Sequence, residues 1–182
     1  MQELSLNILD VVQNSVKADA TLIEITVTEC ARSDTLTITI TDNGCGMDEK
    51  TVGKVVDPFY TTRTTRKVGL GLPLFKMAAE LTGGSFHISS VPGKGTAVEA
   101  VLGLGHIDRM PLGSMCETMT ALISCNAHID FVYTHTVRAK QPPEEKAFVL
   151  DTRQFRDILG EVPLNSPEVI AFIKDYFAEN DV

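Results

Sequence analysis

Residues 35–47 read TLTITITDNGCGM, and this stretch decides how the first part of the chain folds. Leu36, Ile38 and Ile40 alternate with threonines, which predicts a β-strand with one buried face. The strand runs into DNGCG at residues 42–46, where two glycines let the backbone turn tightly and let a flat ligand lie against it. A carboxylate at the end of a strand can accept a hydrogen bond from an exocyclic amine. An ordinary turn is the alternative interpretation.

The flanking segments predict an α+β fold. Before residue 35, apolar residues recur at helical spacing over 4–18, and the β-branched run 21–30 pairs with 35–41 as a hairpin. After residue 47, the patterns predict a helix over 70–81 and strands over 85–91 and 96–102. Gly103 and Gly105 mark a domain boundary near residue 104, which divides the chain into 1–104 and 105–182.

The second segment, 105–182, reads as a small α+β module of unknown role. We expect a helix at about 114–125, strands over 129–137 and 146–150, and then two short helices. Ser166 as N-cap and Pro167 at the first helical position predict the start of the last helix. The module either completes the core of the first domain or docks a partner or a second copy of the chain, because methionine-rich faces such as 110–119 adapt to varied surfaces.

Composition narrows the function classes. The 182 residues carry a formal net charge of −8, which argues against a nucleic-acid partner. The apolar runs are too short for a transmembrane helix, and no basic leader precedes an apolar stretch at the start. The four cysteines show no C-x-x-C pair and do not combine with the four histidines at zinc-ligand spacing. These features predict free thiols in a cytoplasmic protein.

Polar residues of the first predicted helix suit a metal–phosphate ligand. Asp10 and Asn14 are four residues apart, so both side chains lie on one face. A carboxylate and a carboxamide can together hold a hard cation such as Mg²⁺ and orient a water or hydroxyl. Lys17, one turn further on, can reach a phosphate as a point charge. The alternative is the solvated face of an amphipathic helix.

Glycine-rich segments suit phosphate in the same way. Residues 69–72 (GLGL) precede a helix, so free backbone N–H groups and the positive end of the helix dipole face the loop. Residues 60–67 add hydroxyls and three cations, which suits a lid over phosphates. Residues 93–96 (GKGT) follow a predicted strand and, taken alone, predict an ordinary hairpin turn. Taken singly, each segment also fits a hinge, a solvated loop or a plain turn.

The order of these motifs carries a family resemblance. They occur as Asn14, Asp42-x-Gly44-x-Gly46, Asp57-Pro58-Phe59-Tyr60-Thr61-Thr62-Arg63, Gly69-Leu70-Gly71-Leu72 and Gly93-Lys94-Gly95-Thr96. This set resembles the N, G1, F, G2 and G3 boxes of the GHKL ATPase superfamily, and most of all the catalytic ATP-binding domain of bacterial sensor histidine kinases. Asn14-Ser15 followed by residues 18–21 (ADAT) is instead similar to the mismatch-repair ATPases. The resemblance covers about residues 4–102.

The resemblance implies a two-layer α/β sandwich of the Bergerat type with ATP and Mg²⁺ as ligands. By position, Asn14 would ligate Mg²⁺, Asp10 would occupy the general-base or polarising position, and Lys17 would contact phosphate. Asp42 would bind the adenine amino group, with Thr96 completing the adenine side through water. The remaining positions are Gly44 and Gly46 around the adenine, Arg63 approaching the γ-phosphate, and Gly69, Leu70, Gly71 and Leu72 around the phosphates.

Departures from the family pattern leave the activity open. Asp10 stands where hydrolysing members carry glutamate and kinases commonly carry asparagine, and Lys67-Val68 replaces the usual Gly-Thr before GLGL. None of the four histidines is followed by an acidic residue, as a phosphoacceptor histidine would be. We therefore expect a kinase whose acceptor lies on another protein, related to histidine kinases or anti-sigma-factor serine kinases. A slow ATP-hydrolysing switch and a non-catalytic adenine-nucleotide sensor are the alternatives, and a homodimer is one arrangement left open.

Overall fold

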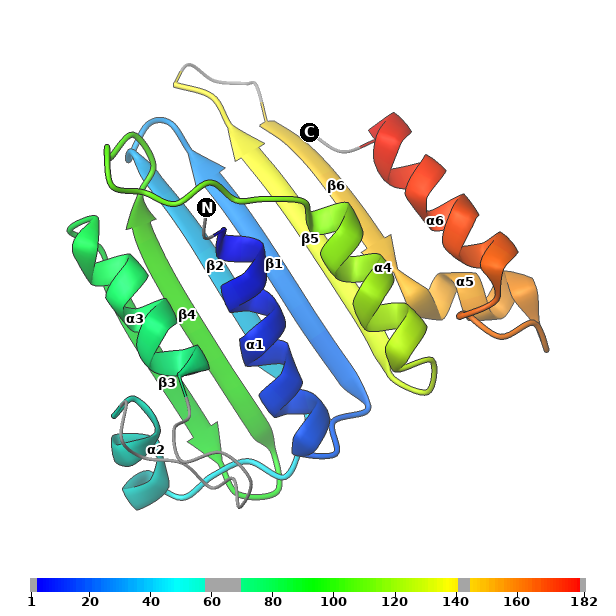
Figure 1. The fold of residues 1–182 in the computed structure, drawn as a ribbon, viewed down its shortest axis with the longest axis horizontal. Helices are drawn as coiled ribbons and strands as arrows, with labels where there is room; N and C mark the ends of the chain where they lie inside the picture. The colour runs from blue at the N-terminus through cyan, green and yellow to red at the C-terminus, as the bar shows by residue number, and fades with distance from the viewer. Residues whose placement is uncertain (1–2, 58–69, 141–144, 181–182) are drawn as a thin grey trace.

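The computed structural model describes residues 3–57, 70–140 and 145–180, in which helices cover a mixed β-sheet (Figure 1). The strands are β1 (Leu22–Cys30), β2 (Thr35–Asp42), β3 (Ser85–Val91), β4 (Gly95–Gly103), β5 (Asp130–Arg138) and β6 (Glu145–Asp151). The helices are α1 (Leu4–Lys17), α2 (Glu49–Val55), α3 (Gly71–Leu81), α4 (Met115–Cys125), α5 (Thr152–Leu159) and α6 (Pro167–Asn180). The predicted α+β sandwich is confirmed.

The predicted hairpins form because each strand alternates apolar and polar residues. In β2, Leu36, Ile38 and Ile40 are buried, while the threonines between them point to the other face. β1 and β2 pair antiparallel, as do β3 and β4. β2 also pairs antiparallel with β4, so the two hairpins join into one continuous sheet.

Residues after 104 extend this same sheet. The strand order is β3-β4-β2-β1-β5-β6, and β5 runs parallel to β1 with Ile25 opposite Tyr133. β6 then pairs antiparallel with β5. The division into two domains at residue 104 stays a prediction. In the sheet, β1 lies between β2, from the first predicted domain, and β5, from the second.

One layer of helices covers one face of the sheet and encloses the core. Figure 1 shows α1, α3 and α4 lying side by side over that face. The fully buried side chains come from both layers and from both predicted domains, and they include Ile8, Val12, Ile23, Ile25, Leu36, Ile38, Phe75, Met119, Phe131 and Tyr133. The methionines of α4 therefore belong to the core, since Met115 is also buried.

The connection between β4 and α4 crosses the helix layer and caps α1. The first backbone N–H groups of α1, at Leu4 and Ser5, donate to the carbonyl oxygens of Pro111 and Leu112 at 2.9 and 2.8 Å. These N–H groups have no partner inside the helix, so the crossing segment satisfies them. At the other end of the connection, Gly105 N–H donates to the Asp34 carboxylate in the β1–β2 turn at 2.9 Å.

Helix α2 was missed by the sequence patterns, for a physical reason. It spans seven residues and has no buried residue, so it shows no apolar periodicity. Its start is fixed by Asp48, whose carboxylate accepts from Thr51 N–H at 2.7 Å. This hydrogen bond is the main cause that lowers the pKa of Asp48 below its ordinary value.

The last two helices are anchored by capping and by aromatic packing. Asp151 caps α5 by accepting from Arg153 N–H at 3.0 Å. Helix α6 begins at Pro167 as predicted but runs for 14 residues, so it is not short. Ser166 occupies the predicted N-cap position, where its carbonyl accepts from Ile170 N–H at 3.0 Å, but its hydroxyl has no hydrogen-bond partner among the described residues. Phe177 instead packs α6 onto the sheet, stacked with Tyr133 at 5.7 Å.

Length and hydropathy decide whether a helix of the described ranges could span a membrane. None of these helices has both the length and the apolar character needed to cross a bilayer. Cys30, Cys45, Cys116 and Cys125 all lie in the described ranges, and none of them forms a disulfide there.

Candidate functional site

The sequence motifs in the described residues gather at one end of the sheet. β2 ends at Asp42, β4 begins at Gly95, and α1 ends at Lys17 directly before β1. This is the lower end in Figure 1, where α2 also lies. Antiparallel pairing of β1, β2 and β4 produces this arrangement, since the start of one strand then lies beside the end of its neighbour.

Asp42 is the centre of the site because it joins three of the motif segments. Its Oδ2 accepts from the Ser15 hydroxyl of α1 at 2.6 Å. Its Oδ1 accepts from Gly44 N–H at 2.9 Å and from Thr96 N–H at 3.2 Å. Asp42 is only 9% exposed, so the carboxylate is held in one orientation by groups from α1, the turn after β2, and β4.

The hydrogen bonds leave Asp42 able to receive a ligand. A carboxylate offers about four lone-pair positions. The Ser15, Gly44 and Thr96 bonds described above occupy three of them. Among the described residues, one position on Oδ2 therefore has no hydrogen-bond donor, and it could accept from an exocyclic amine.

The glycines of residues 44 and 46 are required by close backbone packing. A Cβ on Gly44 would lie 2.7 Å from the Ala18 carbonyl oxygen, and Cys45 N–H donates to that same oxygen at 2.8 Å. Gly46 has φ +66°, and its Cβ would meet the Val91 carbonyl. The turn after β2 is thus pressed between the end of α1 and the β3–β4 hairpin.

The β3–β4 hairpin also packs closely against the end of β2. Gly95 has φ +112°, and a Cβ there would collide with the backbone of Asp42. The Ser90 hydroxyl bonds to the Gly95 carbonyl and the Thr96 hydroxyl, each at 2.9 Å, and accepts from Met47 N–H at 2.8 Å. The segment is therefore more than a plain hairpin turn, because it packs against the end of β2 and bonds to the turn that follows it.

The polar residues of α1 lie on its exposed side. Asp10, Asn14 and Lys17 are all exposed, while the buried positions of α1 face the sheet. Gly71 lies against Asp10, since a Cβ on Gly71 would come within 3.1 Å of the Asp10 Cβ. The structure therefore brings Asp10 to the start of α3.

The start of α3 presents backbone donors. Leu70 occupies the N-cap position and its side chain makes no capping hydrogen bond. Gly71 and Leu72 then supply N–H groups that an intrahelical bond cannot satisfy, and Pro73 has none to satisfy. Leu72 itself is 8% exposed, so its side chain belongs to the core.

Some predicted site residues lie outside the described residues. These are Arg63, Gly69, and the lid segment 60–67. Two contributing residues were not predicted from the sequence, Ser15 and Ser90. Ser15 does carry a signal, because it falls on the buried face of the first helix where an apolar residue is expected.

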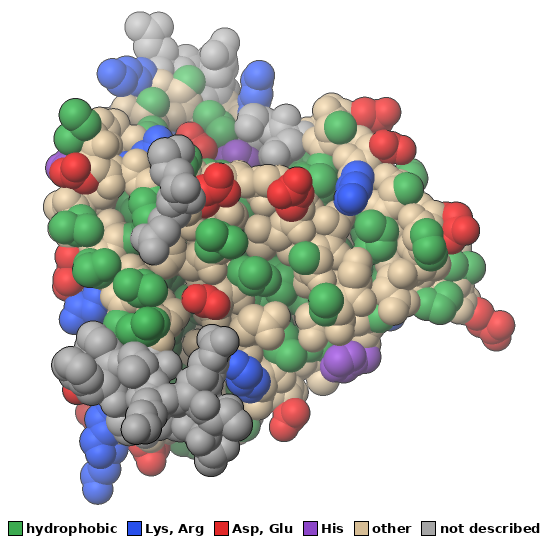
Figure 2. Space-filling view, viewed as in Figure 1, with side chains coloured by type: hydrophobic (Ala, Val, Ile, Leu, Met, Phe, Trp, Pro, Cys, Tyr) green, Lys and Arg blue, Asp and Glu red, His purple; other side chains and the backbone are tan. Residues whose placement is uncertain are grey.

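Charge on the helix-covered face is mixed. Figure 2 shows Lys and Arg scattered among Asp and Glu, in keeping with the net charge of −8. In the parts of the chain that the structure describes, His, Cys, Asp and Glu side chains do not gather in a group of three or more that could hold a metal ion.

Comparisons with known proteins place bacterial sensor kinases among the relatives of this chain. Over 110 residues the chain is 36% identical to the sensor protein kinase FleS of Pseudomonas aeruginosa, covering 60% of this chain and 27% of that protein. Over 96 residues it is 33% identical to the signal transduction histidine-protein kinase AtoS of Escherichia coli, covering 52% and 16%. The chain thus spans about a quarter or less of the length of these relatives.

A solved structure supports the fold alone. The crystal structure of the N-terminal domain of a DNA repair protein superposes with a TM-score of 0.54 at 18% identity, covering 83% of this chain and 53% of that one.

The sequence profile of one family covers more than half of the chain. The profile described as histidine kinase-, DNA gyrase B- and HSP90-like ATPase matches residues 2–106. The resemblance seen in the motifs is confirmed, and the match makes this region an ATP-binding, kinase-like module. The chain belongs to the histidine kinase-, DNA gyrase B- and HSP90-like ATPase family.

Proposed function

We propose that residues 1–104 bind Mg²⁺-ATP and transfer its γ-phosphate to a separate partner protein. The observation that carries the proposal is the fixed carboxylate of Asp42, which keeps one acceptor position open. The adenine amino group would donate to it, between the backbones of Gly44 and Gly46, with Thr96 on the same side. The kinases among the relatives favour transfer over the alternatives.

The triphosphate would extend from Asp42 along α1 to α3. The first N–H groups of α3, at Gly71 and Leu72, have no partner inside the helix and suit phosphate oxygens at a helix N-terminus. Lys17 adds a positive charge from α1, and by family position Arg63 and Gly69 would act from the lid.

The residues present also fit a magnesium ion. Mg²⁺ prefers oxygen ligands and is commonly bound by one or two protein groups plus substrate phosphates. Asn14 offers one amide oxygen on the exposed side of α1, one helical turn from the Asp10 carboxylate. When bound, the ion would neutralise charge on the phosphates.

Binding and transfer are tested in two steps. Calorimetric titration with ATP and ADP, with and without Mg²⁺, should show magnesium-dependent binding that Asp42→Asn weakens. Incubation with γ-labelled ATP and a soluble extract of the cells that make the protein should then label a second protein. Acid-labile label would indicate phosphohistidine, and acid-stable label would indicate phosphoserine. Absence of any nucleotide binding would overturn the proposal.

Hydrolysis is the second candidate, because Asp10 lies against Gly71 at the phosphate end of the site. A carboxylate there can act as a general base toward water. Asp10→Asn should abolish phosphate release while leaving the Kd for ATP unchanged if hydrolysis is the activity. Binding with neither transfer nor phosphate release would instead leave a nucleotide sensor.

A further inference from the structure

We propose that Arg156 and Asp130 are positioning residues for the adenine end of the site. They act through Thr21 and Asn43 on the turn that carries Asp42. The inference rests on the proposed function, because the property that these residues tune is nucleotide binding. It gives a role to the segment after residue 104.

The first step is a clamp made by Asn43, which directly follows Asp42. Its Oδ1 accepts from the N–H groups of Thr21 and Leu22, both at 2.9 Å. Its Nδ2 donates to the Thr21 hydroxyl at 2.9 Å. The backbone that orients the Asp42 carboxylate is thereby tied to the start of β1.

The second step joins Thr21 to β5. Asp130 N–H donates to the Thr21 carbonyl at 2.9 Å, at the point where Leu22 and Asp130 begin the parallel pairing of β1 and β5. Thr21 is therefore held from two sides, by Asn43 on one and by the first residue of β5 on the other. A shift of β5 would move the anchor of the Asn43 clamp.

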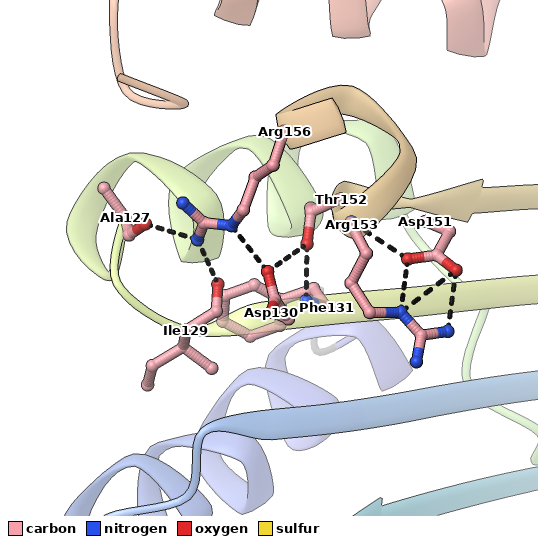
Figure 3. A network of polar contacts seen from close by, with 8 residues as sticks. All are labelled: Ala127, Ile129, Asp130, Phe131, Asp151, Thr152, Arg153 and Arg156. Carbon is pink, nitrogen blue, oxygen red and sulfur yellow. Dashed lines mark hydrogen bonds and ion pairs between the residues drawn. The ribbon is translucent and has the colours of Figure 1, made fainter. Parts of the chain in front are cut away.

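The third step fixes the start of β5 from α5. Arg156 Nε donates to Asp130 Oδ1 at 2.6 Å, and its Nη2 donates to the carbonyls of Ala127 and Ile129 at 2.6 and 3.3 Å. Figure 3 shows the guanidinium lying between these acceptors. One side chain thus holds both the carboxylate of Asp130 and the backbone leading into it.

Thr152 supports the same carboxylate. Its hydroxyl donates to Asp130 Oδ1 at 3.3 Å and accepts from Phe131 N–H at 2.8 Å (Figure 3). Hydrogen bonds between two charged groups are stronger than neutral ones, so the Arg156 bond is the main contact of this cluster. The side chains of Arg156 and Asp130 are 36% and 30% exposed, so substitutions there are compatible with folding.

A matched control lies one turn away on α5. Arg153 pairs with Asp151 at 2.7 Å and does not join the Asp130 cluster in Figure 3. Arg153→Gln removes the same charge from the same helix as Arg156→Gln. A difference between the two variants therefore reports the Asp130 contact and not the net charge.

The test measures Kd for Mg²⁺-ATP and Mg²⁺-GTP by calorimetry in the full chain. We expect Arg156→Gln to weaken ATP binding about fivefold, with a smaller effect on GTP, because guanine carries a carbonyl oxygen where adenine carries the amino group that would donate to Asp42. Arg153→Gln should change neither Kd. The Kd of Arg156→Lys for ATP should lie between those of the wild type and Arg156→Gln. A fall in the ATP preference separates positioning from a merely structural role, which would lower the active fraction and leave the ratio of Kd values unchanged.

A double-mutant cycle tests the route. Asn43→Ala and Arg156→Gln should be less than additive in the free energy of ATP binding if they act along one chain of contacts. Full additivity would overturn the inference, and so would equal Kd values for Arg156→Gln and Arg153→Gln. In either case, ATP binding by the wild-type protein would still uphold the ATP-binding part of the proposed function. A wild-type protein that binds no nucleotide overturns both. If Arg156→Gln fails to fold, Asp130→Asn serves, with the same expected loss of ATP preference.

Discussion

The Ser15 hydroxyl donates to Oδ2 of Asp42 across 2.6 Å, in a buried contact between the last turn of α1 and the end of β2. The bond joins residues 27 positions apart and sets which lone pair of the carboxylate stays open. Helix α1 therefore shapes the adenine end of the proposed site as well as the phosphate end.

Removing this hydroxyl should weaken nucleotide binding more than it harms the fold. Ser15→Ala deletes one hydrogen bond to a charged acceptor, so we expect a loss of about 1.4 kcal/mol, or tenfold in Kd for ATP. Calorimetric titration measures it. Ser5→Ala is the control, because Ser5 is equally buried on α1 but bonds to Glu3. Equal Kd values for both variants would contradict the assignment.

Adding a methyl group at residue 44 should destabilise the protein. The Cβ of Gly44→Ala would lie 2.7 Å from the Ala18 carbonyl oxygen and 2.9 Å from the Ala18 Cβ. Overpacking of this kind costs about 1–3 kcal/mol, which lowers Tm by about 2–12 °C in a chain of this size. Thermal unfolding followed by circular dichroism measures it.

Gly53→Ala is the matched control for that substitution. A Cβ there meets nothing within 4 Å, and Gly53 lies inside α2. Alanine is the better helix former, so stability should rise by up to about 1 kcal/mol. Opposite signs for the two variants are the expected result, and a fall in Tm with both would contradict the packing argument.

Acid should lower the free energy of unfolding partly through Asp151. The hydrogen bond from the Arg153 side chain is the main cause that lowers the pKa of Asp151 below 3.8. The stabilisation is therefore complete above about pH 3.8 and is lost as the pH falls through the lower pKa of the folded state. Asp151→Asn retains a capping side chain but loses the charged contact with Arg153. Its stability in urea should therefore be lower than that of the wild type at neutral pH and should depend less on pH in the acid range. An unchanged acid dependence would contradict this.

A chain that ends at residue 104 should not fold cooperatively. It would leave β1 without its β5 neighbour and expose Ile23 and Ile25 beside the lost core residues Phe131 and Tyr133. It would also leave the first N–H groups of α1 uncapped. Circular dichroism and size-exclusion chromatography measure the outcome. A monomeric 1–104 fragment with a sharp melting transition would show that the predicted domain stands alone.

Local patterns predicted most of the elements because each pattern depends on nearby residues. The alternation of Leu36, Ile38 and Ile40 with threonine specifies a strand with one buried face in any tertiary context. Helix α2 was not predicted, since it has no buried face. The length of α6 was underestimated, although its buried Val169, Ile173 and Phe177 recur at helical spacing along the whole helix.

The sequence by itself determined the family, because the order of the glycine, Asp42 and Asn14 motifs is visible without coordinates. Tertiary structure alone decided the parallel pairing of β5 with β1 and the Ser15–Asp42 and Thr21–Asp130 contacts. Such contacts join residues far apart in the chain, and their energy depends on how strand ends align after the sheet forms. No local pattern encodes that alignment.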